Sequence, residues 1–445
     1  MRRTSILIGV LATALAVVLP AANGRETADP GVTGNSILIG GTTPLSGVAS
    51  AYASVARGAE AYFKYVNARG GVNGRRIQYK YLDDGYNPST TVQQTRQLVQ
   101  QDRVFAIFNS LGTEHNLAIR AYLNTVRVPQ IFAATGARTF GTSFRKYPWT
   151  IGYQPSYYGE AIIYGRWIQR NRKNARIAVI YQNDDYGKEL LNGLRKGLGR
   201  MSKRIVATQG YEVTATDVQS QVARLKSSNA NTFMVFGTPR YAIQSFIYAN
   251  RLGWKPLMFV NSVSSASNIM EIASDAGNNP RVRGAISIQF LKDPTDSTRW
   301  AGDPGMRLYR QIMKKYLPRG NANDVFHVYS MAAAHTFVEA LRKAGRNPTR
   351  SGVMAQLAKL NSKNPFMIPG VTVRTGRLGE PQGRRPLGAV RRPAAHAGLA
   401  EPPGTSLLPW RRGNSSRLRP TSSAPRLAYV APARVSPTRR RFSSR

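Results

Sequence analysis

Short apolar segments typical of β-strands alternate with segments of helical spacing along most of this chain. The run SILIGGT at 36–42 is short and apolar, like a strand buried in a parallel sheet. Residues 51–66 then repeat apolar side chains at helical spacing, and the RGG sequence at 69–71 supplies a helix stop. Strands that are separated by helices pair in parallel, because each helix returns the chain to the starting edge. The pattern therefore predicts an α/β fold.

The alternation forms two series, which are joined by a connecting stretch at 147–155. In the first series we expect strands and helices in turn at 36–42, 51–66, 76–82, 92–101, 104–108, 116–124 and 129–133. In the second series, which begins with a helix, we expect them at 161–169, 176–181, 187–199, 205–211, 218–226, 232–236, 241–252 and 257–260, with a last strand at 284–290. Three further helices are expected at 305–316, 322–344 and 350–360. This predicts two doubly wound, Rossmann-like lobes joined by a hinge, the second inserted into the first.

The first 24 residues have the pattern of a secretory signal peptide. Arg2 and Arg3 precede the uncharged apolar run 6–22, and small residues stand at a cleavage position at 22–24. The apolar run contains Pro20 and is shorter than the roughly 20 residues that a membrane anchor needs. We therefore expect export to the periplasm with cleavage of this segment.

The last 69 residues, 377–445, differ in composition from everything before them. They contain 15 Arg, no Lys, two acidic residues and ten Pro. Such a segment cannot bury enough apolar surface to offset the entropy of ordering, so we expect disorder. Two explanations compete: a genuine basic tail for an anionic surface, or a reading-frame shift near 374–376 in GC-rich coding DNA. We favour the frameshift, because the break is abrupt and no residue pattern continues across it.

Six parts result from this division of the chain. They are the signal peptide at 1–24, the first part of lobe 1 at 35–150, lobe 2 at 151–290, the helical return of lobe 1 at 291–362, a crossover segment at 363–376 and the Arg/Pro-rich tail at 377–445. The tail carries a large share of the formal net charge of +41. In the remainder the basic residues are spread rather than clustered, and no basic helix or stacking motif is present. We therefore expect no nucleic-acid partner.

No catalytic motif is evident in the sequence. There is no nucleophile elbow and no phosphate-binding loop. The acidic pairs at 83–84 and 184–185 directly follow expected strands and stand beside turn residues, so we interpret them as helix caps and turns. The chain has no Cys, and no two of its four His are spaced i, i+4. Disulfides are thereby excluded, and we expect neither a metal site nor a cofactor.

Ligands of open α/β sheets bind beyond the carboxyl ends of the strands. Three loops at such positions are rich in hydroxyls and glycine: TTPLSG at 42–47, NSLGT at 109–113 and AATG at 133–136. Backbone N–H groups at loop-to-helix junctions, together with Ser or Thr hydroxyls, suit a carboxylate. Ordinary turns and caps have the same composition, so the periodicity leaves both interpretations open.

Several segments, taken in order, carry a family resemblance. They are PLSG at 44–47, VNARGGVNGRRI at 66–77, DDGYNP at 83–88, QDRVFAIFNSLGT at 101–113, VPQIFAATGA at 128–137 and YQNDDYGK at 181–188. Together they resemble the periplasmic leucine/isoleucine/valine-type substrate-binding proteins of branched-chain amino acid ABC importers. The resemblance implies the type I periplasmic binding protein fold, whose lobes close on one small carboxylate-bearing ligand. It also implies a monomer that is not an enzyme and that delivers its ligand to an ABC permease in the inner membrane.

The resemblance also implies a set of ligand-binding residues by position. In the first lobe the set is Ser46, Tyr52, Leu111, Gly112, Thr113, Ala133, Ala134 and Thr135. The N–H groups and hydroxyls of this set would hold the ligand carboxylate. From the second lobe Tyr186 would cover the ligand. Tyr153, at the first crossover between lobes, and Asn261, just after the strand at 257–260, complete the set.

Two positions depart from the family pattern at the ligand. Family members typically hold the ligand ammonium with an acidic residue where this chain has Asn261. An ammonium buried without a counter-charge is costly. Gly112 also stands where members often present a hydroxyl. We therefore favour an aromatic or aliphatic acid that lacks an amine, with a branched-chain amino acid as the alternative.

The C-terminus is a further departure. Family members usually continue after a segment like 369–375 with a strand that returns to the sheet, and here the Arg/Pro tract follows instead. Loss of that strand could remove several kcal/mol, comparable with the whole stability of a domain at about 5–15 kcal/mol. Two other interpretations are kept open: a ligand-sensing receptor on the same fold, and a non-functional copy with an altered C-terminus.

Overall fold

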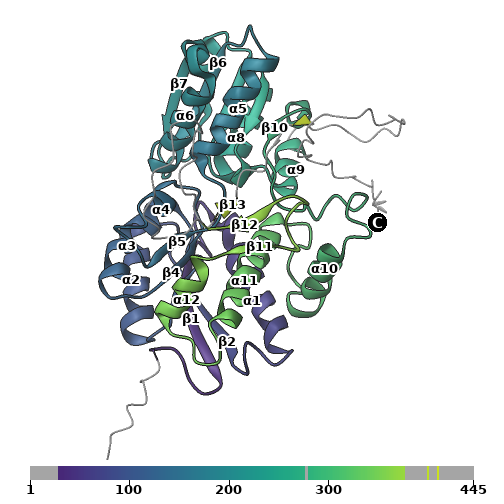
Figure 1. Ribbon diagram of the computed structural model, residues 1–445. Coiled ribbons are helices and arrows are strands. Elements are labelled where there is room, and N and C mark those ends of the chain that lie inside the picture. The colour runs from purple at the N-terminus through teal and green to yellow at the C-terminus, as the bar shows by residue number, and fades with distance from the viewer. Residues whose placement is uncertain (1–28, 276–278, 376–397, 400–407, 410–445) are drawn as a thin grey trace, which may run out of the picture.

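A computed structural model of the protein describes residues 29–275 and 279–375, together with the short pieces 398–399 and 408–409. This part of the chain forms two α/β lobes, with the lobe that contains α5 to α9 at the top of Figure 1. The predicted fold class is confirmed. The predicted signal peptide at 1–24 lies outside the described residues. No helix within the described residues is long and apolar enough to span a membrane.

The sheet of lobe 1 has five parallel strands in the order β2-β1-β3-β4-β5. The strands are β1 (Ser36–Thr43), β2 (Arg76–Asp83), β3 (Ile107–Phe108), β4 (Gln130–Ala133) and β5 (Thr150–Gly152). The helices of this lobe are α1 (Ala53–Asn67), α2 (Pro88–Arg96), α3 (Thr113–Thr125), α4 (Thr139–Thr142), α10 (Pro304–Tyr316), α11 (Val325–Lys343) and α12 (Arg350–Leu357). Since all five strands are parallel, their carboxyl ends share one edge, and the loops at that edge meet lobe 2.

Lobe 2 repeats this design with the strand order β14-β10-β9-β8-β6-β7. Its parallel strands are β6 (Ile177–Gln182), β7 (Ile205–Tyr211), β8 (Thr232–Phe236), β9 (Leu257–Val260) and β10 (Ile286–Ser287). Its helices are α5 (Tyr157–Asn171), α6 (Asp185–Leu198), α7 (Gln219–Ser227), α8 (Pro239–Arg251) and α9 (Ser267–Asp275). Helices α5 and α6 pack together, as do α7 and α8. Both lobes therefore place helix N-termini at the boundary between them.

Two short strands come from the segment that was predicted to be disordered. β14 (Leu408–Pro409) pairs antiparallel with β10 at the edge of the lobe 2 sheet. β13 (Gly398–Leu399) pairs antiparallel with β12 (Thr372–Arg374), which also pairs with β11 (Asn361–Lys363). The prediction of disorder thus does not describe these four residues, and the rest of 377–445 lies outside the described residues.

The sequence pattern missed some of the shorter elements and overextended others, since β3 and β10 lie within the predicted strands 104–108 and 284–290. β5 falls in the expected connecting stretch and ends at Gly152, two residues beyond the predicted first boundary between the lobes. α9 was not expected, and β3 and β10 have only two residues each. Two or three residues show no periodicity, so only the pairing with neighbouring strands identifies such elements. The domain boundaries themselves stay predictions.

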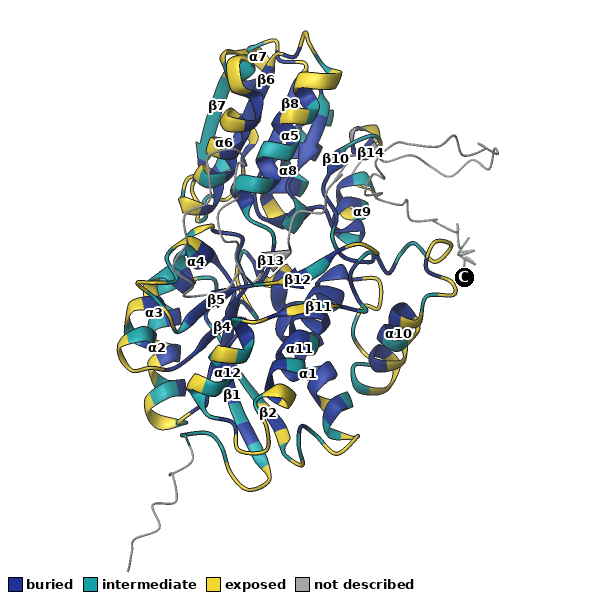
Figure 2. Cartoon of the chain, viewed as in Figure 1, coloured by how far each residue is buried: buried dark blue, intermediate teal, exposed yellow. Residues whose placement is uncertain are grey.

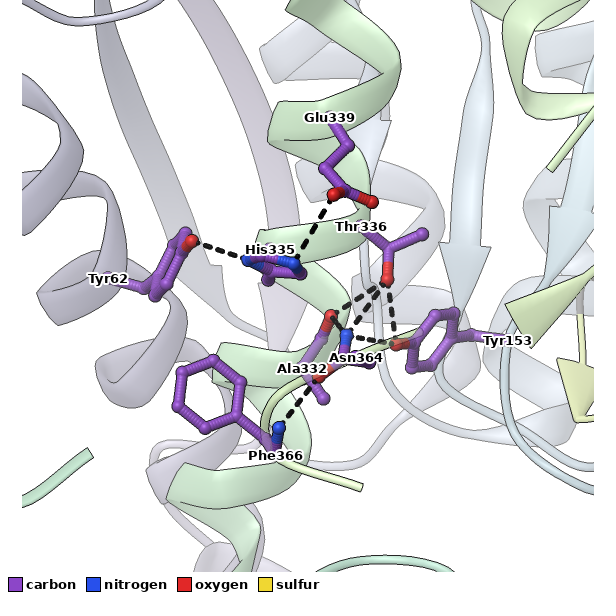
Figure 3. A network of polar contacts seen from close by, with 8 residues as sticks. All are labelled: Tyr62, Tyr153, Ala332, His335, Thr336, Glu339, Asn364 and Phe366. Atoms are coloured by element: carbon purple, nitrogen blue, oxygen red, sulfur yellow. Dashed lines mark hydrogen bonds and ion pairs between the residues drawn. The ribbon is translucent and has the colours of Figure 1, made fainter. Parts of the chain in front are cut away.

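Buried residues concentrate on the strands and on the helix faces that are turned toward them (Figure 2). Helix α11 is buried over most of its length and packs between α1 and α12. A polar network joins it to the chain that leaves β5 (Figure 3). The Tyr153 hydroxyl lies 3.0 Å from Thr336 Oγ1, and Asn364 Nδ2 donates to Thr336 Oγ1 at 3.1 Å and to the Ala332 carbonyl at 2.8 Å. This network fixes one of the crossings between lobes against α11.

Candidate functional site

A cleft between the two lobes is the candidate site. It contains about 740 Å³ of space free of protein atoms, part of it open to solvent. Both lobes and the segments that connect them contribute side chains. The lining residues are Tyr52, Val55, Tyr86, Leu111, Gly112, Thr113, Ala134, Gln154, Tyr157, Tyr186, Thr238, Ser262, Val263, Ser265, Ala266, Gln289, Phe290, Leu291, Val325, Phe326 and Tyr329.

The N-terminus of α3 opens into this cleft from lobe 1. Its N-cap is Gly112, with φ +107°, and no side chain caps the helix. The first N–H groups of a helix have no partner within the helix, and they lie at the positive end of its dipole. Gly112 and Thr113 both line the cleft. The start of α3 is therefore suited to an anionic group from outside the protein.

Gly112 is required here by a neighbouring side chain. A Cβ at this position would lie 2.2 Å from Nδ1 of His115, and the positive φ also disfavours any other residue. His115 is buried and its ring stacks against Tyr86 with centroids 4.3 Å apart. Burial lowers the pKa of His115 to about 4, so the ring is neutral near pH 7. A side chain at 112 thus has no room in this chain.

The second loop at this end of lobe 1 is held by threonine hydroxyls. Thr113 Oγ1 and Thr135 Oγ1 are 2.7 Å apart, and Thr135 Oγ1 also accepts the N–H of Ala137 at 3.0 Å. Ala134 lines the cleft, whereas Thr135 and Ala133 are buried behind it. Thr135 therefore positions Thr113 from behind the cleft wall.

Lobe 2 contributes a tyrosine and a serine-rich turn. Tyr186 lines the cleft, and its hydroxyl accepts a hydrogen bond from Asn261 Nδ2 at 2.7 Å. Asn261 Oδ1 accepts the N–H of Gly237 at 3.2 Å. Asn261 is fully buried and does not line the cleft. Both ends of its amide are thus satisfied inside lobe 2.

A buried carboxylate contacts the serine-rich turn from the side that is turned away from the cleft. Glu160, on α5, accepts the N–H of Ser262 at 2.6 Å, the Ser262 hydroxyl at 2.7 Å and the Tyr164 hydroxyl at 2.7 Å. Burial raises its pKa above the ordinary value. Among the described residues that line the cleft there is no Asp, Glu, Lys, Arg or His. The cleft therefore offers hydrogen-bonding groups but no side-chain charge.

One wall of the cleft is apolar, and of its residues only Leu111 was predicted from the sequence. It is formed by Val55, Leu111, Phe290, Leu291, Val325, Phe326 and Tyr329. Most of these residues belong to the segment after β10 and to α11, which return to lobe 1 late in the chain. The strand-end rule points only to loops after strands, so it could not identify them. The wall suits the hydrocarbon part of a ligand.

The predicted site residues divide into two groups. Those that line the cleft are Tyr52, Leu111, Gly112, Thr113, Ala134 and Tyr186. Those that do not are Ser46, Ala133, Thr135, Tyr153 and Asn261. Ser46 is exposed, and its hydroxyl donates to Asp83 Oδ2 at 2.6 Å. Tyr153 is buried in the α11 network of Figure 3 instead.

The acidic pairs serve as caps and turns, as expected. Asp184 caps α6 by accepting the N–H of Gly187 at 3.1 Å. Asp84 accepts the N–H of Tyr86 at 3.0 Å, and Asp83 accepts the N–H of Leu45 at 2.9 Å. Within the described residues no group of three or more His, Asp or Glu is arranged to hold a metal ion.

Comparisons with known proteins agree with this geometry. A family model described as "Periplasmic binding protein" matches residues 36–383. A Leu/Ile/Val-binding protein homolog from Brucella suis is 27% identical over 343 residues, covering 74% of this chain and 83% of that protein. Among solved structures, a branched chain amino acid ABC transporter protein from Thermus thermophilus with bound valine has a TM-score of 0.64 at 20% identity, covering 75% of this chain and 86% of the other. A fatty acid ABC transporter substrate-binding protein from Thermomonospora curvata has a TM-score of 0.66 at 21% identity, covering 78% and 86%.

Proposed function

This chain belongs to the periplasmic binding protein family, and we propose that it captures a small carboxylate between its lobes and delivers it to an ABC importer. The observation that carries the proposal is the uncapped start of α3 at a cleft that also has an apolar wall. A carboxylate with a hydrocarbon body matches both features. Valine and fatty acids, which are named for two structural neighbours, share this combination.

We further propose that the ligand lacks an amine. No described acidic residue lines the cleft, and the buried carboxylate of Glu160, which contacts the lining residue Ser262, accepts three hydrogen bonds from protein groups. An ammonium in this cleft would lose its hydration without gaining a counter-charge. The branched-chain amino acid that the relatives' names suggest is the alternative.

Matched ligand pairs test the two proposals together. Isothermal titration calorimetry on the full chain would compare 4-methylpentanoate with leucine, and 3-phenylpropanoate with phenylalanine. Each pair differs only by the amine. We expect the amine-free acid of at least one pair to bind more than tenfold more tightly, since an unpaired buried charge costs more than 1.4 kcal/mol. Tighter binding of the amino acid would overturn the amine-free proposal, and no binding of any of the four would contradict the carboxylate proposal.

Delivery to an importer needs its own measurement. A strain that lacks the gene should lose uptake of the radiolabelled ligand at low concentration, and the wild-type gene should restore uptake. Unchanged uptake, with a changed transcriptional or chemotactic response to the ligand, would favour the ligand-sensing receptor. Absence of cooperative thermal unfolding in the purified chain would favour the non-functional copy.

A further inference from the structure

Two carboxylates cross between the lobes beside the ligand cleft. Glu114, in the first turn of α3, places Oε1 2.8 Å from the backbone nitrogen of Asp185, the first residue of α6. Glu189, one turn further along α6, accepts the N–H of Arg138 from lobe 1 with its two oxygens at 3.0 and 3.1 Å. Neither Glu114 nor Glu189 lines the cleft. Both therefore join the lobes without contacting the space in which the ligand would lie.

Each lobe supplies the carboxylate of one of these two contacts. Glu114 reaches from lobe 1 to the N-terminus of α6, where a negative charge is favoured by the helix dipole. Glu189 reaches from lobe 2 to a backbone N–H that follows β4. Opening of the lobes about their connecting segments would separate both pairs, because each joins a residue of one lobe to a residue of the other. The contacts are thus made only in the closed arrangement.

An interaction that exists in one conformation only shifts the equilibrium toward that conformation by its own free energy. Neither Glu114 nor Glu189 lines the cleft, so a ligand in the cleft does not take the place of either hydrogen bond. We propose that Glu114 and Glu189 form a latch that holds the lobes closed and sets how long the ligand stays bound. The effect on the ligand rests on the proposed function, whereas the latch itself can be measured without any ligand.

Distances between the lobes report on the latch directly. The chain has no native Cys, so spin labels attach only at introduced positions. Ser89→Cys on α2 and Ser227→Cys on α7 are exposed sites, one on each lobe. Double electron–electron resonance on the ligand-free labelled chain, at about pH 6, would compare the parent with Glu114→Ala, Glu189→Ala and the double variant. We expect the population of the short distance to fall in each variant and to fall furthest in the double variant.

Glu212→Ala is the matched control. Glu212 is an exposed carboxylate of the same lobe as Glu189, and it accepts a side-chain hydrogen bond from Asn183 within that lobe, at 2.6 Å. Removing it changes the net charge equally but breaks no contact between lobes. Its distance distribution should match that of the parent. Distributions in the two latch variants that are the same as in the parent would overturn the proposal, whatever ligand the protein takes.

Ligand kinetics supply the second readout. With 4-methylpentanoate as the probe in stopped-flow experiments, each latch variant should raise the dissociation rate constant about threefold to tenfold, as expected for the loss of one hydrogen bond between the lobes. The association rate constant should stay within about twofold, because neither residue contacts the ligand. Glu189→Gln keeps an acceptor oxygen and should restore the slow dissociation. A fall in the association rate with unchanged dissociation would contradict the latch. If the wild-type chain binds none of the test acids, the proposed carboxylate function fails, and the distance measurement still decides the latch.

Discussion

Helices α3 and α6 contact each other across the boundary between the two lobes, yet their N-termini differ in capping. Each helix follows a parallel strand and starts at the boundary between lobes. Protein carboxylates bind two N–H groups at the start of α6. Asp184 accepts the N–H of Gly187, and Glu114 accepts the N–H of Asp185. The start of α3, at Gly112, has no side-chain cap. One helix start is thus closed by protein side chains, and the other has no side-chain cap.

The largest effect is expected when the N-terminus of α3 is also given a carboxylate from the protein. Thr113→Asp places a carboxylate in the first turn of α3, where it favours the helix but repels an anionic ligand. We expect the affinity for 4-methylpentanoate to fall at least 100-fold, about 2.7 kcal/mol, with cooperative unfolding retained. Titration calorimetry and thermal unfolding would measure the two effects. Thr113→Ser, which keeps the hydroxyl beside Thr135, is the control and should bind within a few-fold of wild type.

Glu114 and Glu189, the two carboxylates of the latch, also make closure of the lobes dependent on pH. Burial raises the pKa of Glu189 to about 7, while the facing Arg138 lowers it and Asp185 raises it. Burial also raises the pKa of Glu114, which faces Asp185, Asp184 and Lys188. A pKa that is raised by closure means that the closed form binds the proton more tightly, so closure is favoured below the ordinary Glu value and weakened as pH rises through about 7.

We therefore expect the affinity for 4-methylpentanoate to fall up to about tenfold between about pH 6 and pH 8, a range in which this aliphatic acid is mostly ionised. The figure is discounted because Glu189 is not fully buried. Titrations across that range would measure this. Glu189→Gln should flatten most of the dependence. An affinity that rises with pH would show that the sign of the coupling is wrong.

A smaller effect is expected when α6 loses its side-chain cap, a feature that α3 lacks. Asp184→Ala removes the acceptor of the Gly187 N–H, so we expect a loss of about 1 kcal/mol in the free energy of unfolding. Asp185→Ala removes an equal charge from the next position, where no side-chain cap is made, and should cost less. Urea denaturation of both variants gives the difference. Equal losses would mean that charge, rather than the cap, stabilises the start of α6.

The smallest predicted effect concerns the contact between lobes that lies inside the cleft. The Tyr52 hydroxyl donates to the Val263 carbonyl at 3.1 Å, joining lobe 1 to lobe 2. Tyr52→Phe keeps the ring, which meets Phe326 edge-on with centroids 5.0 Å apart, and loses only this hydrogen bond. We expect affinity for 4-methylpentanoate to weaken about threefold. A loss as large as that of Thr113→Asp would mean that the Tyr52 hydroxyl contacts the ligand.

The sequence predicted several strands at their observed bounds, and the cleft only in part. Strands 232–236 and 257–260 were placed at their observed bounds, because apolar runs with clear turns at both ends leave little choice. The strand-end rule and the resemblance together found Gly112, Thr113 and Ala134, which follow strands of lobe 1 directly. They could not find Phe290 or Phe326, because these residues come from a return segment and carry no motif.

Asn261 illustrates what position along the chain cannot show. The resemblance placed it at the ligand, but its amide is turned to Tyr186 and Gly237 inside lobe 2. Whether a polar side chain faces a cleft or the protein interior depends on which donors and acceptors lie within about 3 Å of it. Those neighbours come from other strands, so they are known only once the sheet is assembled.

By itself the sequence determined the α/β class, the two lobes and the hydroxyl- and glycine-rich loops after three strands of lobe 1, because apolar periodicity and composition are local properties. Only the tertiary structure decided that α3 is left uncapped while α6 is closed, that His115 excludes a side chain at 112, and that Glu114 and Glu189 reach across to the other lobe. The reason is physical: hydrogen bonds and close contacts depend on distances of a few ångströms between residues that lie 51 or 71 positions apart in the chain.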